Sequence, residues 1–493
     1  MNAYTALMAH QRRTEALGQV AGRLGWDQET VMPSGAAEQR GEEMAAMEAV
    51  LHARNSDPRI GDWLNAAATE TEGDMVATAQ LRLIRRGFDR ATKVPEHLAT
   101  ELARVTSLAQ GEWAAARAAD DFAAFAPRLT EVVALKREEA AALASGGDLY
   151  DALLDDFEPG MTAAHLDAMF GALRPRLVAL RDAILGAEHQ PAHLAGAFDE
   201  AAQLRLSQTL ARTFGYDLTH GRIDKAVHPF SEGSGQDVRI TTRTDPADPF
   251  NCFFSTIHET GHATYEQRID AAYLLTPIGR GASMGVHESQ SRLYENQLGR
   301  SRPFAGWLHG QMEAAFGTVT DGDTDAFYGM MNRVSPGYIR TEADEVQYNL
   351  HVLLRFDLER DIISGALDPA DLEEAWNTRF AADFGRDVPR AALGCLQDVH
   401  WSVGLFGYFP TYTLGNVYAG CLYQAMREAV PDLDAELASG KPDVALEWLR
   451  ANLQTHGSLY PPEALIIKAC GTPPTVDPLL SYLERKFREI YRI

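Results

Sequence analysis

His258-Glu259-Thr260-Gly261-His262 governs the interpretation of this sequence, because it combines two imidazoles and a carboxylate in a helical spacing. Residues four apart share one face of a helix, so His258 and His262 can hold one cation together. Glu259 lies about a third of a turn away, where it can reach a water on that cation without being a ligand. The pattern predicts a zinc-type catalytic site that carries its own general base. The alternative is a core helix with two hydrogen-bonded histidines.

The residues around this stretch favour a helix. Asp248 supplies an N-cap, and Pro249 suits the first helical position. Because glycine costs about 1 kcal/mol relative to alanine inside a helix, Gly261 indicates that another element packs closely there. Apolar residues recur at spacings of three and four, as on a buried helix face: Phe250, Phe253, Phe254, Ile257 and Gly261.

A catalytic zinc needs a third protein ligand and an open position. The segment 286–292 follows a glycine-rich turn at 279–285 and opens a second helical pattern. Glu288 is the predicted third ligand, which gives a set of two histidines and one glutamate. His287 points to another face of that helix and is the weaker candidate. A solvated glutamate is the ordinary alternative for Glu288, but the nearby histidine pair favours the ligand.

Further short elements stand in a fixed order along the chain: Trp26-Asp27-Gln28-Glu29-Thr30 with Met32-Pro33, His228-Pro229-Phe230, Asp237-Val238-Arg239-Ile240-Thr241, the His258–His262 stretch, His287-Glu288-Ser289-Gln290, Ile339-Arg340-Thr341-Glu342-Ala343-Asp344, and Gly394-Cys395-Leu396-Gln397-Asp398-Val399-His400-Trp401. Together they resemble the carboxypeptidase Taq family of zinc-type metallocarboxypeptidases, nearly from end to end. The resemblance implies a mostly α-helical body divided by a deep groove with the metal at its floor. It also implies homodimers.

The implied activity is release of single C-terminal residues from peptides that have a free C-terminus. His258, His262 and Glu288 would hold the metal, and Glu259 would take a proton from the attacking water and pass it to the leaving amine. An endo-acting oligopeptidase of the same chemistry is the first alternative. A non-catalytic helical metal-binding scaffold is the second, and Glu259 argues against it because binding alone does not need that carboxylate.

Two arginines are candidates for capturing the substrate carboxylate, since a guanidinium can bind it in a bidentate fashion. Arg340 is preferred, because the resemblance associates its motif with the C-terminal end of the substrate. Arg239 shares a predicted strand face with Asp237, and such a strand can pair with an extended peptide. The structural alternatives are a salt bridge from Arg340 to Asp344 and one from Arg239 to Asp237.

Peptide hydrolysis also needs donors directed at the developing oxyanion. His400, His228 and a tyrosine of the segment 406–416 are candidates, with Tyr412 preferred over Tyr408 by analogy with related helical zinc peptidases. That segment is aromatic and punctuated by glycine and proline, so a loop over the site is predicted. The alternatives are packing for the tyrosines and structural hydrogen bonds for the histidines. Asp398 either orients an imidazole or forms an ordinary buried ion pair.

The organisation of the chain predicts one catalytic domain over residues 1–493. No linker, charge block or repeat of about 20–50 residues divides it. An N-terminal helical half is expected at about 1–200, and the metal and substrate site at about 225–415. The fold class is mostly α, with a small β-sheet beside the metal-binding helix. The clearest strand pattern is 238–244, which is β-branched and alternating.

Composition narrows the classes of partner and compartment. The formal charge of −24 argues against nucleic-acid binding and suits a cytoplasmic protein. No apolar run has the length of a signal peptide or a spanning helix, so no membrane association is expected. Cys252, Cys395, Cys421 and Cys470 have no paired spacing and are interpreted as reduced thiols. The predicted cofactor is one divalent ion, Zn²⁺ by ligand type, with Co²⁺ as the alternative.

Overall fold

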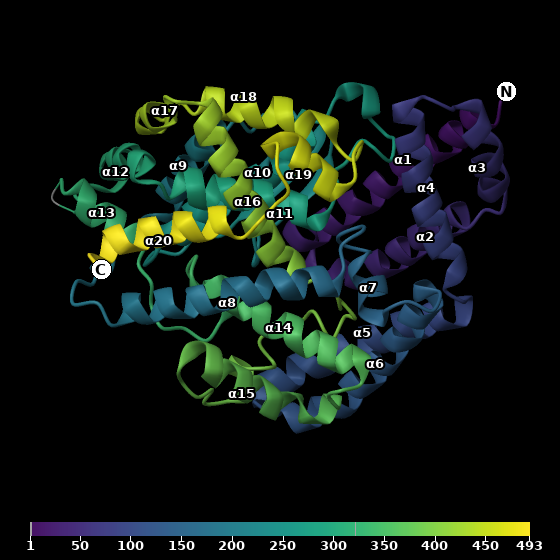
Figure 1. Cartoon of the computed structure of the whole chain (residues 1–493), viewed down its shortest axis with the longest axis horizontal. Coiled ribbons are helices and arrows are strands. Elements are labelled where there is room, and N and C mark those ends of the chain that lie inside the picture. The colour runs from purple at the N-terminus through teal and green to yellow at the C-terminus, as the bar shows by residue number, and fades with distance from the viewer. Residues whose placement is uncertain (1, 321) are drawn as a thin grey trace. The chain divides into compact units, whose positions relative to one another are not determined.

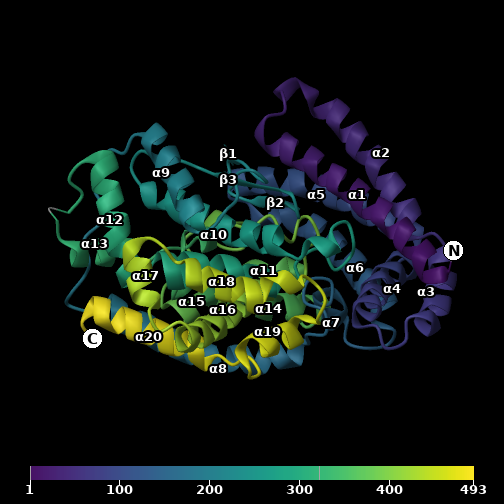
Figure 2. The same cartoon turned by 90° about the horizontal axis from the view of Figure 1, so that it is seen from above.

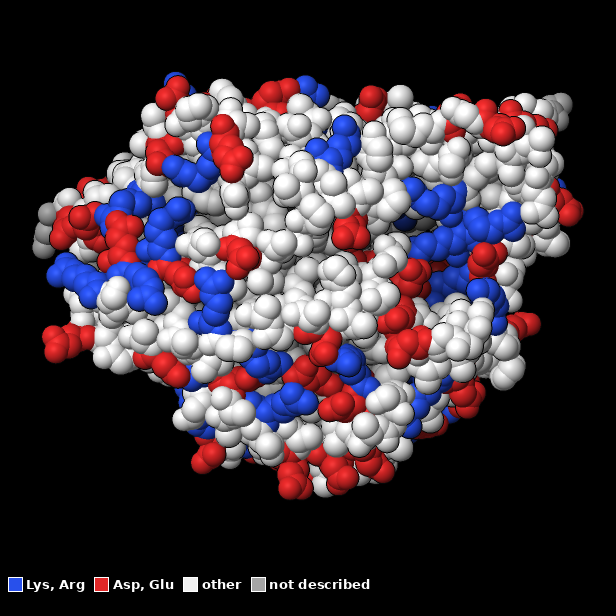
Figure 3. Space-filling view, viewed as in Figure 1, with Lys and Arg blue, Asp and Glu red and all other residues white. Residues whose placement is uncertain are grey.

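The computed structural model describes residues 2–320 and 322–493. Over these residues the chain is 69% helical, with twenty α-helices and one three-stranded sheet, which confirms the mostly α fold class (Figures 1 and 2). No helix in these ranges is both long and apolar enough to cross a membrane. Acidic and basic side chains are interspersed on the face shown in Figure 3, where the clearest basic cluster lies over α4 (Met75–Lys93).

The chain separates into two compact units, each built from three segments. The first unit comprises Met1–Thr92, Ala192–Asn332 and Tyr418–Pro474, and the second comprises Lys93–Pro191, Arg333–Val417 and Thr475–Ile493. The N-terminal helical stretch therefore contributes to both units. The single catalytic domain over residues 1–493 stays a prediction.

The first unit carries the sheet and the helix of the two histidines. Its α-helices, besides α4 and most of α16 (Pro410–Ala429), are α1 (Ala3–Thr30), α2 (Ala37–Asn55), α3 (Arg59–Glu70), α9 (Glu200–Thr213), α10 (Pro249–Arg268), α11 (Met284–Arg292), α12 (Arg302–Phe316), α13 (Thr324–Met331), α17 (Leu433–Ser439), α18 (Asp443–Asn452) and α19 (Pro462–Cys470). Short 3-10 turns η1 (Ser34–Ala36), η2 (Ala271–Tyr273) and η7 (Gln454–His456) and a π-helix, η3 (Leu293–Gly299), complete it.

The small sheet has the strand order β1-β3-β2. The central strand β3 (Asp237–Thr242) pairs in parallel with β1 (Ile223–Lys225) and antiparallel with β2 (Ser231–Ser234). It overlaps the predicted strand 238–244 but begins one residue earlier and ends two residues earlier. Val238 and Ile240 point to one face of β3 and pack into a buried cluster with Ala211 of α9 and Ala263 of α10. The sheet therefore supports the helix of the two histidines, as expected.

The described residues of the second unit form helices and irregular segments, with no strand among them. It contains α5 (Glu96–Ala119), α6 (Phe122–Ala144), α7 (Leu149–Leu154), α8 (Ala163–Leu185), α14 (Gln347–Ser364), α15 (Leu372–Phe384), α20 (Asp477–Tyr491), the first turns of α16, and the 3-10 turns η4 (Arg340–Glu342), η5 (Pro369–Asp371) and η6 (Ala391–Leu393). Helix α14 is the centre of this unit, since most of its residues are buried, including Arg355 and Glu359.

The loop predicted over 406–416 is shorter than expected. Helix α16 begins at Pro410, so only the first part of the segment is non-helical. Pro410 occupies the first helical turn, where its missing N–H costs nothing. Part of the aromatic character reflects burial rather than an open loop, because Phe406 and Phe409 are fully buried, whereas Tyr408 and Tyr412 are partly exposed.

Candidate metal and substrate sites

Helix α10 forms as its sequence predicts. Asp248 caps it through a hydrogen bond from the Phe250 backbone N–H (3.0 Å), and Pro249 occupies the first turn. The predicted apolar face of α10 is buried throughout. A Cβ atom on Gly261 would lie 2.6 Å from the Cα of Ser291, so the backbone of α11 lies directly against this turn. The close packing that Gly261 indicated is confirmed.

This packing brings three donor side chains together. One donor atom each from His258, His262 and Glu288 can be chosen so that all three lie within 4.8 Å of one another. Oε2 of Glu288 lies 3.7 Å from Nε2 of His258 and 3.4 Å from Nε2 of His262. The other carboxylate oxygen, Oε1, accepts a hydrogen bond from Nε of Arg292 (2.6 Å). Arg292 therefore turns Oε2 toward the two imidazoles.

The donor set fits a catalytic divalent cation. Two neutral imidazole nitrogens and one carboxylate oxygen are the ligands of zinc peptidase sites, in which a fourth position stays open for water or substrate. All three side chains are largely buried, with exposed side-chain fractions of 17%, 17% and 8%. A buried carboxylate between two imidazoles is stabilised when a cation joins them.

Glu259 is placed on α10 directly after His258 and is 6% exposed. Burial is the main cause that raises its pKa from 4.5 to about 7, and the neighbouring His258 opposes that rise. A carboxyl group with a pKa near neutrality can both accept and return a proton at physiological pH. This property is what the predicted base requires.

Each histidine of the cluster is held from behind through its second ring nitrogen. Nδ1 of His258 lies 2.9 Å from Oε2 of Glu295, which is on the π-helix η3. Nδ1 of His262 lies 2.6 Å from Nδ1 of His287. The structure thus brings His287 to the cluster, but behind a ligand rather than among the ligands. Glu295 was not predicted, although it follows Glu288 by two helical turns, a spacing that keeps it on the same face.

A second polar cluster lies in the second unit, around Asp398. Oδ1 of Asp398 accepts hydrogen bonds from Nε (3.1 Å) and Nη2 (2.8 Å) of Arg340. Oδ2 accepts from Nε of Arg355 (2.7 Å). Burial would raise the pKa of Asp398, but the two guanidinium groups outweigh it and hold that pKa well below its ordinary value. Two cations around one carboxylate leave one net positive charge in a buried setting.

Two alternatives from the sequence are decided by this cluster. The salt bridge from Arg340 to Asp344 is wrong: Asp344 instead accepts hydrogen bonds from Val346 and Gln347 at the start of α14. Asp398 forms the ordinary buried ion pair rather than orienting an imidazole, since its oxygen lies 3.9 Å from Nδ1 of His400. Arg355 was not predicted. It lies on the buried helix α14, and only its tertiary partner reveals its role.

His400 and Tyr412 meet in the second unit. Nε2 of His400 lies 3.4 Å from the Tyr412 hydroxyl, and the two rings are edge to face. Tyr408 and Phe409 also contact the His400 ring. Burial lowers the pKa of His400 to about 4, so the imidazole is neutral at physiological pH. The structure therefore offers a neutral imidazole and a phenol side by side.

Glu359 holds the segment that carries this pair. It is fully buried on α14 and accepts hydrogen bonds from the Tyr150 hydroxyl (2.7 Å), Trp401 Nε1 (2.8 Å) and the Gly407 backbone N–H (3.1 Å). Trp401 directly follows His400, and Gly407 directly precedes Tyr408. Glu359 was missed in the sequence because no local motif contains it.

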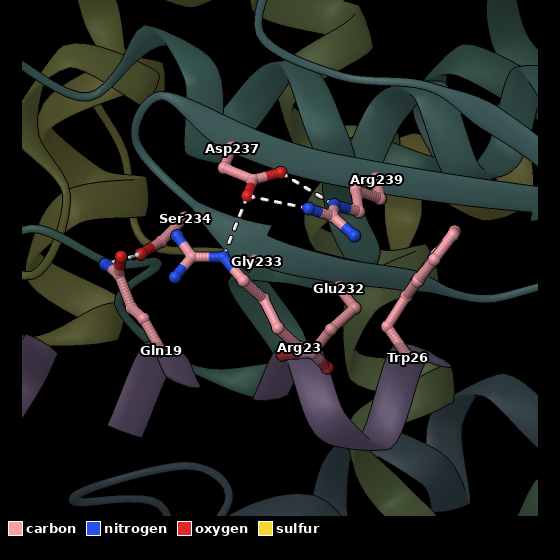
Figure 4. A pocket seen from close by; sticks show the side chains of 8 residues that line it. All are labelled: Gln19, Arg23, Trp26, Glu232, Gly233, Ser234, Asp237 and Arg239. Atoms are coloured by element: carbon pink, nitrogen blue, oxygen red, sulfur yellow. Dashed lines mark hydrogen bonds and ion pairs between the residues drawn. The ribbon is translucent and has the colours of Figure 1, made fainter. Parts of the chain in front are cut away.

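The structure places Arg239 in a different setting from Arg340. Its guanidinium donates to both oxygens of Asp237 (2.8 and 3.0 Å), and it lies 4.7 Å from the ring centroid of Trp26. Arg23 of α1 donates to the same carboxylate, and these residues line a small, partly open pocket between α1 and the β2–β3 hairpin (Figure 4). The salt bridge to Asp237, which the sequence left as an alternative, is present. Arg239 thus joins α1 to the sheet.

His228 is exposed in a bend between β1 and β2. It is on the same unit as the histidine pair, close in sequence to the strand that supports α10. It is exposed, whereas His258 and His262 are largely buried, so surrounding side chains do not enclose His228 as they enclose the histidine pair.

Comparisons with known proteins agree with this arrangement. Residues 6–487 match the sequence model of the carboxypeptidase Taq (M32) metallopeptidases. A relative named thermostable carboxypeptidase 1 from Thermus thermophilus is 41% identical, with 99% of both chains covered. A protein of the same name from Pyrococcus furiosus is 34% identical, covering 98% of this chain and 97% of its own. The crystal structure of an M32 carboxypeptidase from Deinococcus radiodurans superimposes with a TM-score of 0.97 at 38% identity, with 100% of both chains covered.

Proposed function

We propose a division of roles among the site residues that rests on one premise: this chain belongs to the carboxypeptidase Taq (M32) family of metallopeptidases and is a metal-dependent carboxypeptidase. His258, His262 and Glu288 hold the divalent ion, and the ligand types favour Zn²⁺, with Co²⁺ as a substitute. A bound cation of this kind supplies a Lewis acid that polarises a carbonyl and makes a water more acidic. The observation that carries the assignment is the convergence of these three donors beside Glu259.

Glu259 acts as the general base and then as the general acid. Its raised pKa, caused by burial, lets it take a proton from the attacking water near neutral pH and return that proton to the leaving amine. Its position next to His258 on one helix supports this role, because the backbone of α10 fixes the carboxylate relative to the ligand set. Binding a metal without catalysis does not require a carboxyl group in this state.

Arg340 recognises the C-terminal carboxylate of the substrate. The support is the excess positive charge of the Arg340–Asp398–Arg355 cluster, which a substrate carboxylate would neutralise. Asp398 fixes one edge of the Arg340 guanidinium, and the Tyr348 hydroxyl accepts from Nη1 at 3.2 Å. A guanidinium held by these partners is preorganised, so little side-chain entropy is lost when a carboxylate binds.

His400 and Tyr412 stabilise the developing oxyanion. The neutral state of His400 supports this assignment, since a neutral imidazole and a phenol can each donate one hydrogen bond. Arg239 and His228 remain predictions as substrate-binding residues. For Arg239 the observed contacts with Asp237 and Trp26 favour support of the strand instead.

Peptide substrates follow from the family, whereas the homodimer stays a prediction from resemblance. A cytoplasmic location is proposed from the four cysteines, which are all free thiols, as expected in a reducing compartment. The endo-acting alternative differs from the proposal in one respect, because it does not need a free substrate carboxylate.

The test of the proposed function uses the wild-type protein. Elemental analysis of the purified protein is expected to find one divalent ion per chain. Released products are then compared for one peptide as its free acid and as its C-terminal amide. Release of the last residue from the acid and strong discrimination against the amide support the proposal. Equal cleavage of both forms, at an internal bond, would establish the endo-acting alternative.

A further inference from the structure

Three side chains of the first unit form a continuous row behind the metal cluster. Nδ1 of His262 lies 2.6 Å from Nδ1 of His287, and Nε2 of His287 lies 3.1 Å from Oε1 of Glu266. His262 and Glu266 are one turn apart on α10, and His287 is on α11. Both nitrogens of His287 are therefore occupied by the row itself.

The contacts determine where the protons lie. Two imidazole nitrogens 2.6 Å apart share one proton, so one donates and the other accepts. If Nε2 of His262 is a metal ligand, it carries no proton, and its Nδ1–H is the donor. Nδ1 of His287 then accepts, which puts the proton of His287 on Nε2, and that N–H donates to Glu266. Every polar contact in the row is satisfied in only this arrangement.

The loop before α11 is shaped to hold the row. The backbone N–H of Gly281 donates to the same Glu266 oxygen at 2.8 Å. A Cβ atom on Gly281 would lie 2.6 Å from Cδ2 of His287 and 3.2 Å from Oε1 of Glu266, so only glycine leaves room for the His287 ring. The Ser458 hydroxyl fixes the loop further by donating to the Gly281 carbonyl (2.9 Å). The glycine-rich turn 279–285 therefore packs against His287.

Glu266 is buried next to His287 and this turn. It is 6% exposed, and its second oxygen, Oε2, is buried without a hydrogen-bond partner among the residues that the structure describes. A buried carboxylate with one unused oxygen costs stability. The other oxygen, Oε1, contacts both the Gly281 backbone N–H and Nε2 of His287.

We propose that Glu266 and His287 are positioning residues that form a relay to His262. The relay fixes the protonation of Nδ1 in His262 and the direction of its ring, so that Nε2 is presented as a lone pair to the cation. The proposal rests on the proposed function, since it takes His262 as a ligand. It also explains why His287 is not a ligand itself, although it is adjacent to Glu288 in the sequence.

The first test measures the dissociation constant of Zn²⁺ by competition with a chelator, for wild type, His287→Leu and His287→Asn. Leucine removes the acceptor for His262, so Zn²⁺ binding should weaken by about 10- to 100-fold, as for other groups that orient metal ligands. Asparagine carries its Oδ1 on Cγ, as histidine carries Nδ1, so it can still accept from His262. It should recover most of the lost affinity, which a merely structural role of His287 would not produce.

Variants of Glu266 and a control complete this test. Glu266→Gln keeps an acceptor oxygen and should lose less than about 10-fold in Zn²⁺ affinity, whereas Glu266→Leu should resemble His287→Leu. Glu447→Gln is the matched control, because Glu447 is exposed and pairs with Arg450 outside the row. Its Zn²⁺ affinity should equal that of wild type.

A second measurement does not depend on variants that fold. Nitrogen-15 spectra of histidine-labelled, Zn²⁺-loaded wild type should show the proton of His262 on Nδ1 and that of His287 on Nε2. The opposite proton position on His287 overturns the relay, and so does unchanged Zn²⁺ affinity in His287→Leu. If His262→Ala itself retains Zn²⁺, the ligand set of the proposed function fails instead, and the two failures are thereby distinguished.

Discussion

Nδ1 of His258 lies 2.9 Å from the Glu295 carboxylate, while Nε2 of the same ring faces Glu288. Glu295 thus directs one imidazole toward the cluster in the way that carboxylates behind metal-binding histidines do. It is itself held by Arg292 and Arg300, each with a nitrogen 3.5 Å from the carboxylate. Glu295 reaches His258 from the first turn of the π-helix η3.

Glu295→Ala should therefore weaken metal binding while leaving the three ligands in place. A loss of about 10- to 100-fold in affinity is expected, and Glu295→Gln should lose less because the carboxamide oxygen can still accept. The measurement is the metal dissociation constant by chelator competition. Glu447→Gln is the control, since Glu447 pairs only with Arg450 on the surface. Unchanged affinity in Glu295→Ala would show that His258 is oriented by other contacts.

Removal of any one of the three ligands should prevent the protein from holding one metal ion per chain. His258→Ala, His262→Ala and Glu288→Ala each leave two donors, which bind a divalent ion weakly. Metal content after gel filtration and turnover of a peptide substrate are measured together. His309→Gln is the control, because it removes a buried imidazole that stacks on Phe327 away from the cluster. A Glu288→Ala protein that keeps one ion per chain and near-normal turnover contradicts the ligand set.

Arg340→Ala should lower kcat/KM for a free-acid peptide. The corresponding activation free energy should rise by about 2–4 kcal/mol, as for truncation of one member of a buried charge pair. The variant should also lose the preference for acid over amide. Arg340→Lys should rescue only part of the rate, because an ammonium lacks the planar fork. The measurement is kcat/KM for one peptide in both forms. Arg239→Ala is the comparison and should keep the preference, since Arg239 pairs with Asp237. The opposite outcome for the two arginines would reverse their roles.

Stability should depend on pH through Glu359. Burial raises its pKa from 4.5 to about 7, so between these values the folded protein holds a proton that the unfolded chain has released. The free energy of unfolding contributed by this group is greatest below about pH 4.5 and falls as pH rises toward 7. At about 1.4 kcal/mol per pKa unit, the loss is of the order of 3 kcal/mol.

The check is the free energy of unfolding at pH 5 and pH 8 in wild type and Glu359→Gln. Glutamine is neutral at both values, so the variant should show a smaller decrease between them than wild type does. The exposed residue Glu374 provides the control, and Glu374→Gln should retain the wild-type difference. Equal differences in wild type and Glu359→Gln would mean that Glu359 is ionised throughout.

The sequence anticipated those parts of the site that depend on local geometry. The cap at Asp248, the buried face of α10 and the close packing at Gly261 follow from residues within one or two helical turns. His258, His262 and Glu288 lie on two α-helices that follow one another in the sequence, α10 and α11. Their grouping could therefore be predicted, and the structure brings them together. Helical periodicity and capping residues specify such features with little help from distant contacts.

Partners that lie far apart in the sequence could not be predicted. Asp344 is four residues from Arg340, whereas the actual partner, Asp398, is 58 positions away. Glu359 and Trp401 meet only in the packed second unit. The aromatic segment after Leu405 resembled a loop because glycine and proline punctuate it, yet burial of its rings favours α16. In each case tertiary packing outweighed a local preference.

The most direct test of the catalytic assignment is Glu259→Gln. Glutamine keeps the size of the side chain but cannot take a proton from water, and it leaves His258, His262 and Glu288 intact. Metal content per chain and kcat for a free-acid peptide are measured on the same preparation. The account predicts full metal content and a kcat lower by about 10²-fold or more. A metal-replete Glu259→Gln protein with wild-type kcat would contradict it.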